Sequence, residues 1–304
     1  MNAFDGMLCS AASADVPLPG TATRVSSWLC VEHPGAWGRD VIGDEVLGPE
    51  ISAELAARTT AARARPTLIR RPGRTEFTGV RTVLLVNSRA EGGWCERLEI
   101  TDLKQLLEID LHLLDGPPPG IGEPVTDPLV LVCAHGKRDQ CCAMLGRPIA
   151  ATLATAHPDR VWECSHTGGH RFAPAMVLLP SGLTYGRVDA AAATAAVAAV
   201  HRGEVALTGL RGRSGHRPVE QVAELAVRAE IAAGLDELTV RVDAETDFTA
   251  TDPTHAGSAL VTHRDGRRWR VTARTVAYAP RQASCGAGAK PVTALVADTI
   301  QSLP

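Results

Sequence analysis

Two cysteines and two histidines have the types and spacing of metal ligands. Cys133 and Cys142 have eight residues between them, and His166 and His170 have three. Thiolate and imidazole donors together suit zinc, copper or an iron–sulfur centre, whereas calcium and magnesium prefer oxygen ligands. Two of the three residues between the histidines are glycines, and glycine lets a compact centre approach the backbone closely. We therefore interpret these four residues as a metal-binding set.

The spacing leaves two kinds of centre open. Structural zinc usually takes two cysteines that are about two to four residues apart, which this cysteine pair does not match, although H-x3-H does fit zinc. A [2Fe–2S] centre is wider, and in Rieske centres two histidines replace two cysteines on one iron. A third hypothesis is a thiol oxidoreductase that uses Cys141 and Cys142. It is weakened because the chain has no C-x-x-C at the expected strand-to-helix turn.

The predicted elements place the candidate ligands at one edge of a sheet. The apolar run Pro128–Cys133 predicts a strand that is buried on both faces and ends at the first cysteine. Arg160–Cys164 predicts a second strand, followed by the loop that carries the histidines. Two loops on the same edge would then supply two ligands each. His135, between the cysteines, is interpreted as a residue that tunes the centre at most.

The elements that follow predict a thioredoxin-like domain. Pro148 suits the first position of a helix that runs through Ala156. Residues 175–188 read as a β-hairpin around a Pro-Ser-Gly turn, and Asp189 is expected to cap the alanine-rich helix 190–201. The order strand, helix, strand, hairpin, helix is that of a thioredoxin-like domain. We therefore expect an α/β protein in which this domain is flanked by N- and C-terminal α+β segments.

A proline-rich stretch at residues 116–128 is the clearest boundary in the chain. It predicts an N-terminal α/β region over residues 1–126, the thioredoxin-like domain over 127–215, and a C-terminal α+β region over 216–304. Within the first region, 102–114 predicts an amphipathic helix. The sequence shows no internal repeat.

Composition predicts a folded protein and excludes several partners. Apolar residues make up 45% of the chain and charged residues 21%, which excludes a disordered protein. The formal net charge of -3 gives no reason to expect a nucleic-acid partner. No apolar run is long enough to cross a membrane, and the start lacks the features of an export signal, so we expect a cytoplasmic protein. The eight cysteines are then expected to stay reduced or to bind metal.

Four motifs resemble those of the sucrase/ferredoxin-like family, whose ferredoxin part is similar to the thioredoxin-like [2Fe–2S] ferredoxins. They are CAHGKRDQCC (133–142), GRP (146–148), WECSHTGGHRFAP (162–174) and LPSGLTYGRV (179–188). The motif match covers residues 129 to 215. The N-terminal third looks more loosely like the bacterial full-length members, so the resemblance extends over most of the chain.

The resemblance implies an electron-transfer protein with one [2Fe–2S] cluster. Cys133 and Cys142 would supply the thiolates, and His166 and His170 would replace the two cysteines of ordinary thioredoxin-like ferredoxins. Related sequences often lack a cysteine before the second ligand, which favours Cys142 over its neighbour. We expect an electron carrier that works with a redox protein partner. We do not expect a sucrase, because the sequence places no carboxylate pair across a cleft.

Charge predicts how such a cluster would behave. Neutral imidazoles in place of two thiolates raise the reduction potential, to roughly −150 to +300 mV if Rieske behaviour carries over. An imidazole ligand can also release its outer-ring proton, so reduction is expected to be coupled to protonation. The basic residues Lys137, Arg138 and Arg171 could stabilise the reduced state or dock an acidic partner. Cys141 is interpreted as a packed, inert cysteine, and the basic run 210–218 as a solvated turn.

Overall fold

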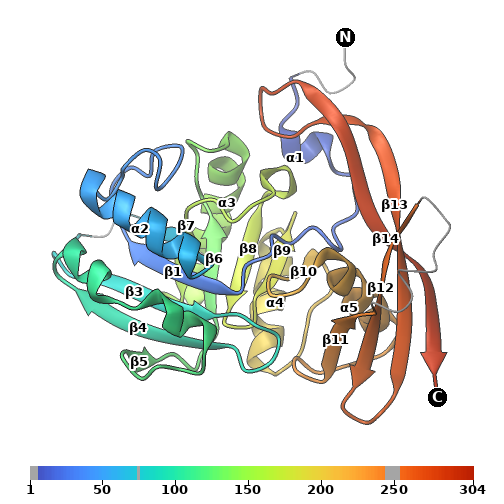
Figure 1. The fold of residues 1–304 in the computed structure, drawn as a ribbon. Helices are drawn as coiled ribbons and strands as arrows, with labels where there is room; N and C mark the ends of the chain where they lie inside the picture. The colour runs from blue at the N-terminus through green and yellow to red at the C-terminus, as the bar shows by residue number, and fades with distance from the viewer. Residues whose placement is uncertain (1–5, 74–75, 244–253) are drawn as a thin grey trace.

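The computed structural model describes residues 6–73, 76–243 and 254–304, and it has a mixed α/β fold, as predicted (Figure 1). The strands of the described residues form one sheet of ten strands and one of four. The larger sheet has the spatial order β10-β9-β8-β6-β7-β2-β1-β3-β4-β5. Its strands are β1 (Ser27–Glu32), β2 (Ala64–Arg70), β3 (Arg81–Asn87), β4 (Trp94–Ile100), β5 (Glu123–Pro124), β6 (Leu129–Cys133), β7 (Val161–Cys164), β8 (Ala175–Leu179), β9 (Leu183–Gly186) and β10 (Leu210–Arg213).

The strand pattern of this sheet repeats, although the sequence shows no repeat. In the first half, β1 pairs parallel to β2 and antiparallel to β3, which pairs antiparallel to β4. In the second half, β6 pairs parallel to β7 and antiparallel to β8, which pairs antiparallel to β9. The halves meet where β2 and β7 pair antiparallel, and the Arg70–Glu163 ion pair of 2.7 Å spans that junction. The same strand order and pairing therefore occur twice in the sheet.

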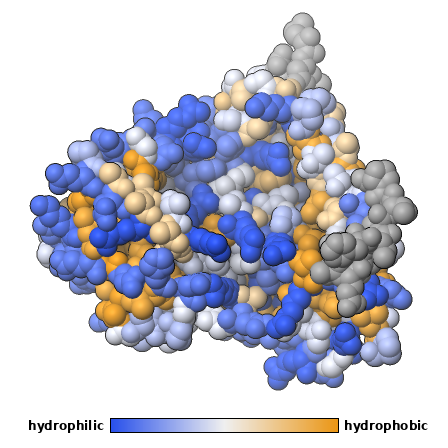
Figure 2. Space-filling view, viewed as in Figure 1, coloured by the Kyte–Doolittle hydropathy of each residue, from blue (hydrophilic) through white to orange (hydrophobic). Residues whose placement is uncertain are grey.

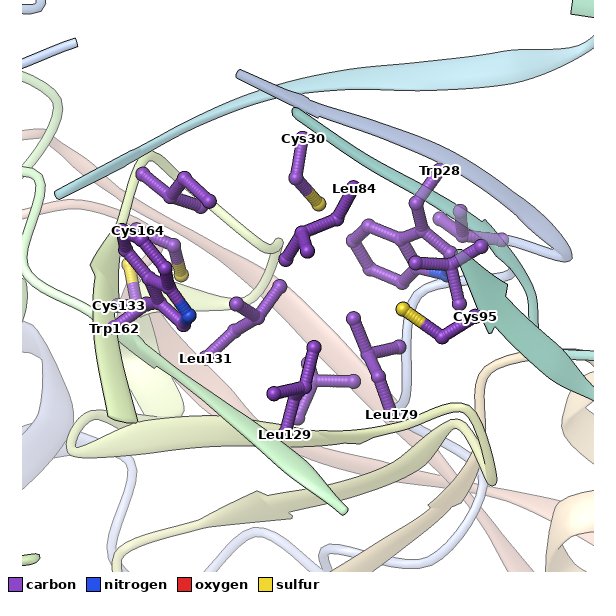
Figure 3. Packing of buried hydrophobic residues seen from close by; sticks show 14 of the residues in the cluster. Trp28, Cys30, Leu84, Cys95, Leu129, Leu131, Cys133, Trp162, Cys164 and Leu179 are labelled. Carbon is purple, nitrogen blue, oxygen red and sulfur yellow. The ribbon is translucent and has the colours of Figure 1, made fainter. Parts of the chain in front are cut away.

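The sheet curls, and its inner face forms the core between the halves. Figure 3 shows Trp28, Cys30 and Cys95 of the first half facing Cys133 and the other labelled residues of the second half across this core. Alternate residues of each strand turn to the outer face instead. On the second half, β6, β8 and β9 pack there against helices, and on the first half β1 and β3 do so. Both faces are thus buried, which explains the continuous apolar runs of the strands.

Helices α2, α3 and α4 cover the outer face of the larger sheet. The α-helices that the structure describes are α1 (Cys9–Ala12), α2 (Pro49–Ala61), α3 (Gln140–Ala156), α4 (Ala190–His201) and α5 (Pro218–Glu230). The 3-10 helices are η1 (Leu103–Glu108), η2 (Leu111–Asp115) and η3 (His170–Phe172). As predicted, Asp189 caps α4 by accepting a hydrogen bond from the backbone N–H of Ala192.

The predicted start of α3 is wrong. The helix begins at Gln140, because the Asp139 carboxylate accepts a hydrogen bond from the N–H of Cys141 and so caps the first turn. Pro148 lies inside the helix. Gly146 packs directly on β6, where a Cβ would overlap the carbonyl oxygen of Cys133. The helix therefore brings both adjacent cysteines into its first turn.

Residues 102–114 also differ from the prediction of one amphipathic helix. They form most of the two 3-10 helices η1 and η2. Asp102 accepts a hydrogen bond from Lys104 N–H, and Asp110 accepts one from His112 N–H. Each aspartate thus caps its own short turn, and the second cap interrupts the run. The apolar side chains still face the core of the first half.

The basic run 210–218 is a buried edge strand and turn, which corrects the prediction of a solvated turn. Arg211 is fully buried and Arg213 nearly so. Arg213 Nε lies 3.0 Å from Glu224 Oε1, and Arg228 Nε lies 3.0 Å from the same oxygen. Glu224 on α5 therefore neutralises buried charge brought together from β10 and α5.

The smaller sheet comes from the C-terminal part of the chain, with the order β11-β12-β13-β14. Its strands are β11 (Leu238–Val242), β12 (His255–His263), β13 (Arg268–Gln282) and β14 (Ala289–Leu303). Helix α5 packs on this sheet, and the turn between β13 and β14 reaches α1 (Figure 1).

The surface in the view of Figure 2 is mostly hydrophilic. Apolar residues gather near β3–β5 and over the C-terminal sheet. Ile121, which is 45% exposed, lies in the loop before β5. Among the described residues, no helix is both long and apolar enough to span a membrane.

Candidate metal centre

The structure brings three of the four predicted ligands together. Cys133 ends β6, Cys142 lies in the first turn of α3, and His166 follows β7. One donor atom from each of these residues lies within 4.8 Å of the other two. His170 begins η3, and its ring centroid lies 5.1 Å from that of His166. His170, the fourth predicted ligand, is thus adjacent to His166 but does not belong to the group of three donors that lie within 4.8 Å of one another.

Both histidines have a free nitrogen at the site. Nδ1 of His166 and Nδ1 of His170 are buried, and neither has a hydrogen-bond partner within the described part of the chain. A buried polar atom without a partner is costly, and a metal ion would satisfy it. His170 also hydrogen-bonds to the backbone of Ala283. A metal-bound histidine typically uses its second nitrogen in this way, so the residues fit a metal centre.

Electrostatics favour the ligand charge state at Cys133 and His170, whereas a hydrogen bond with Cys133 raises the pKa of Cys142 well above its ordinary value. A hydrogen bond from the Cys142 thiol lowers the pKa of Cys133 well below its ordinary value; burial opposes that shift, and a hydrogen bond with His166 adds to it. Burial lowers the pKa of His170. A thiolate and a neutral imidazole are the forms that bind metals. The helix α3 adds its positive N-terminal end beside Cys142.

Two arginines that the sequence did not single out as site residues hold the histidine loop, together with His135. Arg65 on β2 donates to the carbonyl of His166 at 2.5 Å, and Arg211 on β10 donates to the carbonyl of Gly168 at 3.2 Å. His135 accepts a hydrogen bond from the N–H of His166 and bonds to the Gly38 carbonyl through its other nitrogen. The two arginines lie on strands far from this loop in sequence, so local patterns gave no signal for them beyond the basic run at 210–218, whereas His135 was noticed from its place between the cysteines.

The absence of a side chain at Gly168 is expected to matter for the stability of the protein. Its φ is +99°, and a Cβ there would overlap Thr23 Oγ1. We expect Gly168→Ala to lower the free energy of unfolding by about 2–5 kcal/mol, through left-handed strain plus overpacking. Chemical denaturation of the purified variant measures this change.

Gly266 provides the matched control. Its φ is +97°, and a Cβ there would meet nothing within 4 Å in the described structure. Gly266→Ala should therefore cost only the backbone strain, about 1–2 kcal/mol. Equal losses in the two variants would contradict the close approach of Thr23.

A pocket of about 480 Å³ opens beside His170. Residues 169–172 form one wall, and the C-terminal sheet forms the other with Thr293, Ala294 and Leu295. The candidate ligand is itself part of the lining, so a small molecule or a partner's side chain in this pocket would lie next to the centre.

The remaining cysteines have two kinds of surroundings. Cys30, Cys95 and Cys164 lie in the inner core (Figure 3). Burial raises the pKa of Cys164 well above its ordinary value, which fits the predicted role as a core residue. Cys141 is packed, as predicted, and its sulfur contacts those of Cys9 and Cys285. A hydrogen bond with Cys9 lowers the pKa of Cys141 to about 5.

The chain matches the pattern of a known family. The pattern of the family described as Sucrase/ferredoxin-like matches residues 18–212, more than half of the chain. The chain belongs to the sucrase/ferredoxin-like family. No curated protein and no solved structure shows a significant match to the chain. The family segment includes Cys133, Cys142 and both histidines of the candidate centre, whereas Cys9 and Cys285 lie outside it.

Proposed function

We propose that this member of the sucrase/ferredoxin-like family is an electron-transfer protein with one [2Fe–2S] cluster. Cys133 and Cys142 would bind one iron, and His166 and His170 the other. The observation that carries the proposal is the donor set at one sheet edge: two buried cysteine sulfurs, and two buried imidazole nitrogens without a partner among the described residues. When bound, the cluster would accept and release single electrons.

The position of His170 favours a binuclear centre over zinc. Four donors at 2.0–2.3 Å from one tetrahedral ion lie within about 4 Å of one another. Cys133, Cys142 and His166 are close to such an arrangement, but His170 does not belong to that closest group. A [2Fe–2S] centre spreads its ligands over two irons and accommodates the more distant histidine.

The chain's own groups would tune the potential of this centre. Two neutral imidazoles leave the centre less negative than four thiolates would, which raises the reduction potential. Nε2 of His170 lies 3.8 Å from Asp139 Oδ2, and His170 hydrogen-bonds to the Ala283 backbone. Loss of an outer-ring proton would favour the oxidised state, so the potential is expected to fall as pH rises.

The surroundings of the site favour an acidic redox partner. Lys137 and Arg138 are exposed in the loop between the two cysteines, and Arg171 lines the pocket beside His170. Positive charge near the exit point of an electron speeds association with a negatively charged surface. We propose that a protein partner docks over this loop.

Exchanging the histidines for cysteines tests the proposal. We expect anaerobically purified protein to be red-brown, with iron and acid-labile sulfide in equal amounts. His166→Cys and His170→Cys should retain the cluster, and their potentials should fall from the Rieske range of roughly −150 to +300 mV toward roughly −400 mV. The pH dependence of the potential should weaken in both variants. Visible spectra and redox titrations at several pH values measure these changes.

Two results would contradict the proposed iron–sulfur cluster, and a third would contradict its histidine ligation. One is a colourless protein that holds one zinc per candidate centre, which would indicate a zinc-stabilised interaction module. The other is a failure to take up iron and sulfide during anaerobic reconstitution. A potential that does not change in either variant would show that the histidines are not ligands.

A further inference from the structure

A second group of metal donors lies outside the proposed cluster site. The Sγ atoms of Cys9, Cys141 and Cys285 and a carboxylate oxygen of Asp139 all lie within 4.8 Å of one another. The Cys9 and Cys141 sulfurs are 3.6 Å apart, and the Cys141 and Cys285 sulfurs are 3.0 Å apart. Cys9 Sγ lies 3.7 Å from Asp139 Oδ2. Four potential ligands therefore surround one point.

These donors come from three distant parts of the chain. Cys9 belongs to α1, Cys141 to the first turn of α3, and Cys285 to the turn between β13 and β14. Cys9 and Cys141 are 132 positions apart, and Cys141 and Cys285 are 144 apart. Because no local sequence pattern places them together, their convergence is a property of the tertiary structure.

The surroundings resemble those of a closed structural site. Cys9 and Cys141 are fully buried, and Asp139 is 4% exposed. Asp139 Oδ2 accepts hydrogen bonds of 2.9 Å from Ser284 Oγ and from Cys285 N–H. Carboxylates that bind metals are commonly oriented by such hydrogen bonds. Ser10 Oγ also donates to Cys141 Sγ at 3.4 Å, as a hydroxyl does to a thiolate.

We propose that Cys9, Cys141, Cys285 and Asp139 bind one structural zinc ion. Three thiolates select a soft or borderline metal over calcium and magnesium. Zinc–sulfur bonds of about 2.3 Å in a tetrahedral site separate the sulfurs by about 3.8 Å, close to the Cys9–Cys141 separation. A disulfide would use only two of the three cysteines. All four ligand positions are filled by protein, which is the arrangement of structural zinc.

The zinc site would fasten three segments together. It would tie α1 and the β13–β14 turn to the start of α3. Because Cys141 directly precedes Cys142, the same helical turn then carries a ligand of each site. The zinc ion would fix the backbone that presents Cys142 to the proposed cluster, although its own binding does not depend on that cluster.

Metal content of the full-length protein tests this proposal. Protein equilibrated with zinc and dialysed should retain one more zinc ion per chain than the Cys9→Ser or Cys285→Ser variant, by elemental analysis. Cys30→Ala serves as the control, because it removes a buried thiol from the inner core and should retain the ion. Cys133→Ser should retain this zinc ion as well, even though it disrupts the proposed cluster site. Loss of zinc from Cys285→Ser but not from Cys133→Ser therefore separates the two sites.

X-ray absorption at the zinc edge tests the site in the wild-type protein alone, so the result does not depend on whether a variant folds. The wild-type protein should show three sulfur neighbours at about 2.3 Å and one oxygen at about 2.0–2.2 Å. The proposal is overturned if the wild type retains no zinc, if Cys285→Ser retains as much zinc as the wild type, or if Cys141 and Cys285 form a disulfide. Each of these outcomes is independent of whether iron and sulfide are present.

Discussion

Cys133→Ser is expected to remove more than nine-tenths of the iron and acid-labile sulfide from anaerobically purified protein. Cys133 belongs to the closest donor group, with its sulfur within 4.8 Å of donor atoms on both Cys142 and His166. Its low pKa makes it the thiolate of the cysteine pair. A serine hydroxyl at this position would stay protonated near neutral pH and is a poor ligand for iron–sulfur clusters. Iron and sulfide analysis, together with the visible spectrum, measures the loss.

Cys164→Ser is the matched control for this variant. Cys164 is the register partner of Cys133 on the neighbouring strand β7, and it is equally buried. It does not belong to either donor group found in the described structure. The control should therefore retain iron and sulfide, whatever stability it loses. Retention of the cluster in Cys133→Ser, or equal losses in both variants, would show that Cys133 is not a ligand.

Glu224→Gln is expected to lower the free energy of unfolding by about 3–5 kcal/mol, because it leaves buried cations without their counter-ion. Glu224 is 1% exposed and lies 3.0 Å from Arg213 Nε and 3.0 Å from Arg228 Nε. His216 Nδ1 lies 3.2 Å from its other oxygen. Chemical denaturation measures the loss. Glu230→Gln, an exposed position on the same helix, should change stability by less than about 0.5 kcal/mol.

The effect of Glu224 should also depend on pH in a defined direction. Burial alone would raise the pKa of this carboxyl, but the charge of Arg213, the adjacent His216 imidazole and the charge of Arg228 lower it well below its ordinary value. A carboxyl with a lowered pKa stabilises the fold above its unfolded pKa of about 4.3, and this stabilisation is lost as pH falls further. The difference between wild type and Glu224→Gln should therefore shrink below about pH 4. A constant difference down to pH 2 would contradict the buried ion-pair network.

The inner core shows how much of the fold the sequence could predict. Strands such as Pro128–Cys133 are apolar on consecutive positions, because both faces of the sheet are covered. That pattern predicted the order of elements in the second half, and the Asp189 cap followed from its residue type. The start of α3 was mispredicted, because Pro148 is a stronger local signal than the Asp139 cap that precedes it.

The repeated strand topology could not be predicted from the sequence, for a physical reason. The two halves share strand order and pairing, but their core residues differ, and a fold requires apolar character at buried positions rather than particular residues. The buried arginines were missed for a related reason. A charged residue is normally predicted to be exposed. Arg211 and Arg213 can be buried because Arg211 donates a hydrogen bond to a backbone carbonyl from a distant loop and Arg213 forms an ion pair with Glu224.

By itself, the sequence determined the family motifs, the order of elements around them and four candidate ligands, because motif residues at strand ends are local features. Only the tertiary structure placed three of these ligands within 4.8 Å and left His170 beside them. Only the tertiary structure joined Cys9, Cys141 and Cys285, which lie on separate segments. Chain folding brings such residues together through packing of remote elements, and spacing along the sequence does not record that proximity.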